Sequence, residues 1–101
     1  MPLSSKERAA LRAEAHHLSA SVHVGQHGMT EAWRQTLDDA LRTHELVKIQ
    51  FTKNALVEVK DAAHELATTM DADVVQVIGR TTTLYRYNPD LKRTGDSPWK
   101  K

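Results

Sequence analysis

The sequence predicts a single compact α/β (α+β) domain of order αβαβαββ, with three helices and a mixed four-stranded sheet. Its 101 residues, of which 40% are hydrophobic and 27% are charged, fit one globular domain. Apolar residues recur at helical spacing in three segments and alternate with polar residues in the segments between them. The predicted elements are helix 4–16, strand 19–24, helix 29–44, strand 46–52, helix 54–70, strand 74–78 and strand 81–87. Helices separate the first three strands, and a tight turn at Gly79 and Arg80 joins the last two into a hairpin.

The first helix and the first strand are indicated by a capping pattern and by alternation. Ser4 can cap a helix, and Glu7 three residues later completes a capping box. A solvated helix face is expected for the basic residues Lys6, Arg8 and Arg12. Val22 and Val24 then alternate with polar residues, which is typical of a short, half-buried strand.

The second and third helices are predicted from their apolar stripes. The stripe of the second helix comprises Met29, Trp33, Leu37, Ala40, Leu41 and His44. The stripe of the third comprises Val59, Ala62, Ala63, Leu66, Ala67 and Met70. The β-branched residues Val57 and Val59 leave the start of the third helix open by about one turn.

Composition excludes several classes of protein. The chain has no cysteine, so disulfides and thiolate metal sites are excluded. Its N-terminus lacks the apolar core of a signal peptide, and no apolar stretch approaches the ~18 residues of a membrane helix. We therefore expect a soluble, cytoplasmic protein with no membrane partner. The net charge of +1 is weak evidence for a nucleic-acid ligand, so an RNA-binding surface would require the fold to gather basic residues on one face.

The most informative feature is the Gly-x-x-Gly loop Gly25-Gln26-His27-Gly28 between a strand and an amphipathic helix. Glycines give the backbone unusual freedom and let a sugar-phosphate chain approach closely. The first turn of the following helix offers unpaired N–H groups and a positive dipole end, which suit a phosphate. KH domains clamp single-stranded RNA backbone with a loop of this pattern. Taken alone, the motif is more often an ordinary turn before a helix.

The surrounding sequence resembles the CRM domain (chloroplast RNA splicing and ribosome maturation), whose bacterial stand-alone members are the YhbY-like proteins. The resemblance rests on three blocks in order, over about residues 3–87. The first block is Val24, Gly25, Gly28, Met29, Thr30 and Glu31; the second is His44, Glu45, Leu46, Val47 and Lys48; the third is Val75, Gln76, Val77, Ile78, Gly79, Arg80, Leu84, Tyr85 and Arg86. It implies a fold similar to the C-terminal domain of the third bacterial translation initiation factor.

The resemblance also implies a function and a site. The expected ligand is RNA, and the expected target is ribosomal RNA in precursors of the large ribosomal subunit, whose maturation the protein would assist. The candidate RNA-binding residues are Gly25, Gln26, His27, Gly28, Met29, Thr30, Lys48, Arg80 and Arg86. Some family members place Lys or Arg where this chain has Gln26 and His27. Because histidine is charged only near or below pH ~6.5, the grip on phosphate would rest mainly on backbone N–H groups.

The domain is expected to span residues 1–87, followed by a flexible basic tail over 88–101. Trp99 in that tail is a candidate for base stacking, although an idle tryptophan is the simpler interpretation. Trp33 is expected in the core. The basic residues Lys48, Arg80 and Arg86 could instead be solvated strand residues paired with acidic neighbours.

Other functions find little support in the sequence. The six histidines have no spacing that completes a metal site, and no nucleophile–base pair or cofactor loop stands out. We therefore expect no enzymatic activity, no metal, no cofactor and no small-molecule substrate, and we assume a monomer. The competing hypothesis is a protein-interaction module that docks a partner through its helix surfaces without contacting RNA.

Overall fold

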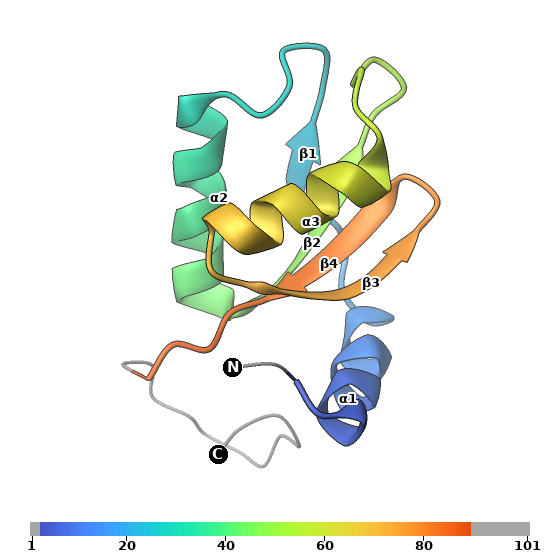
Figure 1. Cartoon of the computed structure of the whole chain (residues 1–101), viewed down its shortest axis with the longest axis vertical. Coiled ribbons are helices and arrows are strands. Elements are labelled where there is room, and N and C mark those ends of the chain that lie inside the picture. The colour runs from blue at the N-terminus through green and yellow to red at the C-terminus, as the bar shows by residue number, and fades with distance from the viewer. Residues whose placement is uncertain (1–2, 90–101) are drawn as a thin grey trace.

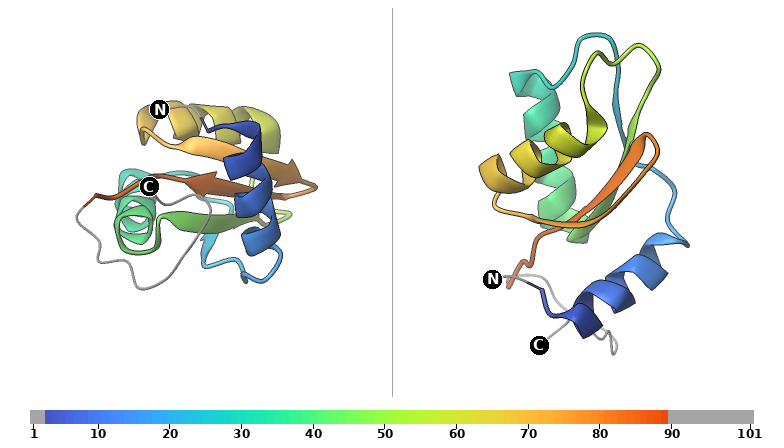
Figure 2. Two further views of the ribbon diagram at one scale, coloured as in Figure 1. Left: turned by 90° about the horizontal axis from the view of Figure 1, so that it is seen from below. Right: turned by 45° about the vertical axis from the view of Figure 1, so that its right-hand side comes forward.

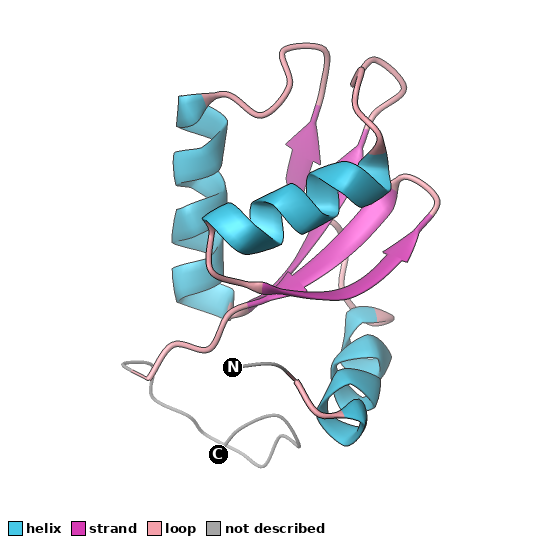
Figure 3. Ribbon diagram, viewed as in Figure 1, coloured by secondary structure: helices cyan, strands magenta, loops and turns pink. Residues whose placement is uncertain are grey.

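The computed structural model describes residues 3–89 and shows three helices and one four-stranded sheet (Figures 1 and 3). The elements are α1 (Ser5–Ala15), β1 (Val22–Val24), α2 (Glu31–His44), β2 (Leu46–Phe51), α3 (Val59–Thr69), β3 (Asp73–Ile78) and β4 (Thr81–Tyr85). The order αβαβαββ and the mixed sheet are as predicted. The predicted tail falls largely at 90–101, and these residues, Trp99 included, lie outside the described ones.

The sheet has the strand order β1-β2-β4-β3. β1 runs parallel to β2, with Val22 opposite Ile49, while β4 is antiparallel to both of its neighbours. A register shift between Val74 and Gln76 interrupts the β3–β4 pairing. Because β1 and β2 are parallel, their C-terminal ends lie at the same end of the sheet, and the β3–β4 turn lies at that end too (Figure 1).

The helices lie on opposite faces of the sheet (Figure 2). α2 and α3 cover one face, where Leu37, Leu41 and Leu66 pack with Ile49 and Phe51 in the larger core cluster. α1 covers the other face, where a smaller cluster comprises Leu11, Leu46, Val75 and Tyr85. The alternation of β2 explains this division, because successive side chains of a strand point to opposite faces.

Several boundaries differ from the prediction. α2 begins at Glu31, because Thr30 is its N-cap and accepts a hydrogen bond from the Trp33 amide at 3.2 Å. α3 begins at Val59, several residues later than expected, with Glu58 as its N-cap. Residues 52–58 therefore form a loop and not the first turn of a helix. The strands are shorter at β1 and at the end of β4.

Three side chains also differ from the prediction. Trp33 is half-buried at the margin of the core, and its indole N–H donates to the His23 carbonyl at 2.8 Å. His44, expected on the apolar stripe, is exposed. Arg8, expected on a solvated face, is half-buried and its guanidinium donates to the Val74 carbonyl, so it ties α1 to β3.

Candidate nucleic-acid interface

Three loops gather at one end of the sheet, which we call the loop end. They are the Gly loop (25–30) between β1 and α2, the β2–α3 loop (52–58), and the β3–β4 turn (79–80). In Figure 1 the first two lie at the top and the turn lies at the right, below them. The Thr52 amide donates to the Val24 carbonyl at 2.9 Å, and the Phe51 amide donates to the Arg80 carbonyl at 2.7 Å. These two bonds fasten the three loops to one another.

The Gly loop is an exposed turn. The Gly28 amide donates to the Gly25 carbonyl at 3.0 Å, and the side chains of Gln26 and His27 are exposed at its tip. Gly28 has φ 71°, a conformation that side-chain-bearing residues avoid. Gly25 has no such requirement, and a Cβ atom there would lie 3.9 Å from Thr52 Oγ1, which is ordinary contact. The two glycines therefore differ: the backbone conformation favours glycine at position 28, whereas the fold would accept a side chain at position 25.

The N-terminus of α2 continues directly from this loop. Thr30 binds the amides of Trp33 and Arg34 through its hydroxyl and its carbonyl. The amides of Glu31 and Ala32 have no partner within residues 3–89, and both residues are exposed. The Glu31 carboxylate is exposed in the same turn, so a bound phosphate would depend on the amides and the helix dipole rather than on a net positive charge.

Arg34 forms an ion pair between α2 and α3 and also binds the backbone just before α2. Arg34 donates to the Glu65 carboxylate, with Nη1–Oε2 at 3.0 Å, and its Nε donates to the carbonyl of Met29 at 3.1 Å. The hydrogen bond with Glu65 raises the pKa of Arg34, and the same bond lowers the pKa of Glu65. Met29 itself packs against the main core. The backbone between the Gly loop and α2 is thus fixed from both sides.

The three basic residues predicted for RNA binding are not brought together. Arg80 lies at the loop end, and its guanidinium donates to the carbonyls of Phe51, Thr52 and Ala55 at 3.0, 2.6 and 3.2 Å. Lys48 is in the middle of β2 and donates to two carbonyls at the end of α1. Arg86 follows β4 at the opposite end of the sheet, where it binds Asp38 and the Met70 carbonyl. All three help to hold the fold together, and their contact with RNA stays a prediction.

Other cations are free. Among the lysines and arginines of residues 3–89, those without a hydrogen bond or ion pair are Lys6, Arg12, Lys53 and Lys60. Lys6 and Arg12 lie on α1, whereas Lys53 is exposed on the β2–α3 loop and Lys60 is exposed in the first turn of α3. Sequence reasoning missed Lys53, because it placed the start of a helix where the structure has an exposed loop.

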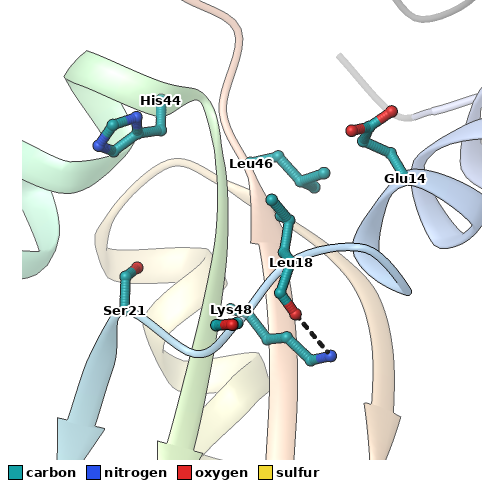
Figure 4. A pocket seen from close by; sticks show the side chains of 7 residues that line it. Glu14, Leu18, Ser21, His44, Leu46 and Lys48 are labelled. Atoms are coloured by element: carbon teal, nitrogen blue, oxygen red, sulfur yellow. Dashed lines mark hydrogen bonds between the residues drawn. The ribbon is translucent and has the colours of Figure 1, made fainter.

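A pocket of about 320 Å³ lies away from the loop end. It lies between the end of α1, the segment leading to β1, and the start of β2, and its lining includes Glu14, Leu18, His44 and Lys48. Figure 4 shows that the Lys48 ammonium extends to the carbonyl of Leu18. Because its ammonium is engaged in this way, Lys48 contributes to the packing of α1 against the sheet.

Residues 3–89 offer neither a metal site nor a membrane-spanning helix. No three histidine, aspartate or glutamate side chains lie close enough to hold a metal ion in that part of the chain. None of its helices has the length and apolar character needed to cross a membrane.

Comparison with known proteins places this geometry in a family. The chain is 31% identical to the probable RNA-binding protein YqeI of Bacillus subtilis, over 90% of this chain and 95% of that protein. It is 37% identical to the probable RNA-binding protein MJ0652 of Methanocaldococcus jannaschii, over 90% of this chain and 69% of that protein. The solution structure of the hypothetical protein SAV1595 from Staphylococcus aureus matches with a TM-score of 0.75 and 30% identity, over 90% and 95% of the two chains. The profile of the CRS1 / YhbY (CRM) domain matches residues 3–86, and the chain therefore belongs to that family.

Proposed function

We propose that this protein binds RNA, and that the Gly loop grips the RNA backbone. The observation that carries the proposal is an exposed Gly-x-x-Gly turn that leads directly into the unpaired amides of Glu31 and Ala32. Phosphates bind readily at such a helix N-terminus. Relatives named as probable RNA-binding proteins in a bacterium and an archaeon support the same class of ligand.

The basic residues extend this surface to different degrees. Arg80 uses Nε and Nη2 for its three carbonyls, and its Nη1 has no partner within residues 3–89. This nitrogen at the loop end can donate to a phosphate without breaking the bonds that fix the loop. Lys48 and Arg86 would have to exchange internal partners for RNA, so we expect Arg80 to contribute most of the three.

The proposed target is ribosomal RNA in precursors of the large subunit, in the cytoplasm. Backbone contacts position a protein but carry little sequence information. A domain that relies on them selects RNA by shape and accessibility. A partly assembled particle exposes RNA that later becomes covered by proteins and tertiary contacts. We expect the tagged protein to sediment with precursor large subunits at low salt, to leave them as salt rises, and to be scarce on translating ribosomes. Sedimentation only at the top of the gradient, with no ribosomal RNA crosslinked in cells, would contradict this target.

The test of the loop uses Gly25, because substitution of Gly28 would be strained at its positive φ. Gly25→Asp places a carboxylate where phosphate must approach, and Gly25→Ala adds a methyl group without charge. We expect thermal unfolding of both variants to match the wild type, since the added Cβ meets only ordinary contact. Binding of a fluorescent single-stranded RNA should weaken at least about tenfold for Gly25→Asp, through repulsion and lost contact together, and less for Gly25→Ala.

Salt titration separates this function from a protein-docking module. A protein that neutralises phosphates loses affinity steeply as salt rises, with a slope of about −0.7 per phosphate for single strands. Arg80→Ala should reduce that slope by about 0.7 in magnitude. Normal binding by a folded Gly25→Asp variant, or binding that is insensitive to salt, would show that the loop is only a turn.

A further inference from the structure

We propose that the β2–α3 loop is a second RNA-binding element, in which Lys53 contacts a phosphate and Leu56 packs against a base. The inference rests on the proposed function, because it places this contact beside the nucleotide whose backbone the Gly loop holds. The two residues differ in chemistry and therefore make separate, testable contributions.

Leu56 is the most exposed large hydrophobic residue that the structure describes. Its relative accessibility is 93%, compared with 59% for Ile78. Its neighbours are anchored: Ala55 is buried in the main core, and Val57 packs against that core. Leu56 lies between these two inward-facing residues, so its own side chain projects into solvent. It therefore lacks the free energy that burial of a leucine side chain would contribute.

The loop that presents Leu56 is tied down. The Ala55 amide donates to the Thr52 carbonyl at 3.0 Å, which closes a turn. Arg80 Nη2 donates to the carbonyls of both residues, at 2.6 Å to Thr52 and 3.2 Å to Ala55. An exposed apolar side chain on an already ordered loop can bind a partner at little further entropic cost.

The surroundings of Leu56 favour RNA as that partner. Lys53, three residues before it, is exposed, and neither its ammonium nor Arg80 Nη1 has a partner in the described part of the chain. The Glu58 carboxylate accepts from the Lys60 amide at 3.3 Å, so it is directed to the start of α3. An apolar side chain beside unpaired cations matches a ligand that alternates apolar base faces with phosphates.

The position of the loop supplies the second argument. Thr52 joins this loop to the end of β1 through the 2.9 Å bond from its amide to the Val24 carbonyl, directly before Gly25. A Cβ atom on Gly25 would come within 3.9 Å of the Thr52 hydroxyl. The two loops therefore begin at neighbouring residues and lie side by side (Figure 1). We expect an RNA strand that is held by one loop to pass close to the other.

The experiment compares two probes of equal length: a fluorescent strand of twelve uridines and a twelve-unit ribose-phosphate strand that lacks bases. For Leu56→Ala we expect about fivefold weaker binding of the uridine strand, the effect of losing part of one leucine's apolar contact. Its binding to the base-free strand should not change. Lys53→Ala should weaken both probes and reduce the magnitude of the salt slope by about 0.7. The matched control is Lys6→Ala, another lysine without a partner within residues 3–89, which lies on α1 away from the loop end and should bind as the wild type does.

The outcomes separate this inference from the proposed function. Normal binding by both loop variants, with binding lost in Gly25→Asp, would overturn the inference and leave the Gly loop as the RNA site. Normal binding by all three variants would overturn both. An equal loss on both probes for Leu56→Ala would exclude a base contact. A Leu56→Ala variant that keeps its RNA affinity but loses a protein partner or self-association would also overturn the inference.

Discussion

The two ends of the sheet use their hydrogen-bond donors in different ways. At the loop end, the amides of Glu31 and Ala32 and the ammonium of Lys53 have no partner within the described residues. At the opposite end, Arg86 gives its guanidinium to Asp38 and to a carbonyl of α3. The comparison shows that a residue of the family motif, Arg86, can be engaged within the fold, while a residue outside the motif, Lys53, has no partner among the described residues.

Glu45 illustrates how groups at the end opposite the loop end are engaged within the fold. It is the single residue between α2 and β2, it is buried, and it has φ 64°. Its amide donates to the Leu41 carbonyl, its carbonyl accepts from the Arg86 amide, and its carboxylate accepts from the Asn88 amide at 2.6 Å. The strained link is therefore held by bonds to the helix before it and to the segment after β4. These bonds also fix Asn88, the first residue of the predicted tail.

The largest effect is expected for Arg86→Ala. The side chain is 19% exposed and joins β4 to Asp38 of α2 and to the end of α3. Its removal leaves two carbonyls and a carboxylate short of a donor, which should lower the free energy of unfolding by about 2–3 kcal/mol. Chemical denaturation measures this. The matched control is Arg42→Ala, because Arg42 also pairs with Asp38 but is 60% exposed, and should cost less than about 1 kcal/mol. Equal losses would mean that burial does not distinguish the two arginines.

Arg80→Ala tests how far the guanidinium of Arg80 orders the β2–α3 loop. We expect a loss of about 1–2 kcal/mol in unfolding free energy, since water can replace part of what the three carbonyls lose. Hydrogen exchange at the Ala55 amide should accelerate more than exchange in the core strands. Lys53→Ala, in the loop itself, should change the unfolding free energy by less than about 0.5 kcal/mol. An unchanged Ala55 exchange rate would show that Arg80 does not order the loop.

Thr30→Asp separates stability from binding at one position. Aspartate is as good an N-cap as threonine and favours the helix dipole, so thermal stability should be retained. The added charge faces the proposed phosphate site, and one such repulsion of about 1 kcal/mol corresponds to about fivefold weaker RNA binding. Thr30→Ser is the control and should preserve both properties. Unchanged RNA affinity in the aspartate variant would move the phosphate away from this helix turn.

The smallest effect is expected for the pH dependence of stability that comes from the Arg34–Glu65 ion pair. The bond from Arg34 lowers the pKa of Glu65, so the pair contributes stability above the unfolded glutamate pKa of about 4.3 and loses it as pH falls through the lower folded value. Glu65→Gln should reduce stability at neutral pH by less than about 1 kcal/mol, because the pair is partly exposed. The difference from the wild type should shrink below pH ~4. A difference that stays constant with pH would point to a cause other than the ion pair.

Periodicity predicted the order of the elements, but it predicted neither the order of the strands in the sheet nor the partners of the charged side chains. The alternation of Val47, Ile49 and Phe51 and the stripes of the helices predicted the two faces of the sheet and the order of the elements. The Gly loop was found where the pattern placed it, between β1 and α2. The pattern could not show that Arg80 and Arg86 bind carbonyls, because those partners lie far away in the sequence. It also hid the β2–α3 loop, since the alanine and valine residues there fit a helix as well as an anchored loop.

The ends of the described chain have a practical consequence. The described chain begins just before α1 and ends shortly after β4, and both of these points lie at the end of the molecule opposite the Gly loop (Figures 1 and 2). The described part of the chain is therefore entered and left at points away from the proposed RNA surface. A connection made at either of these points would leave the Gly loop open to RNA.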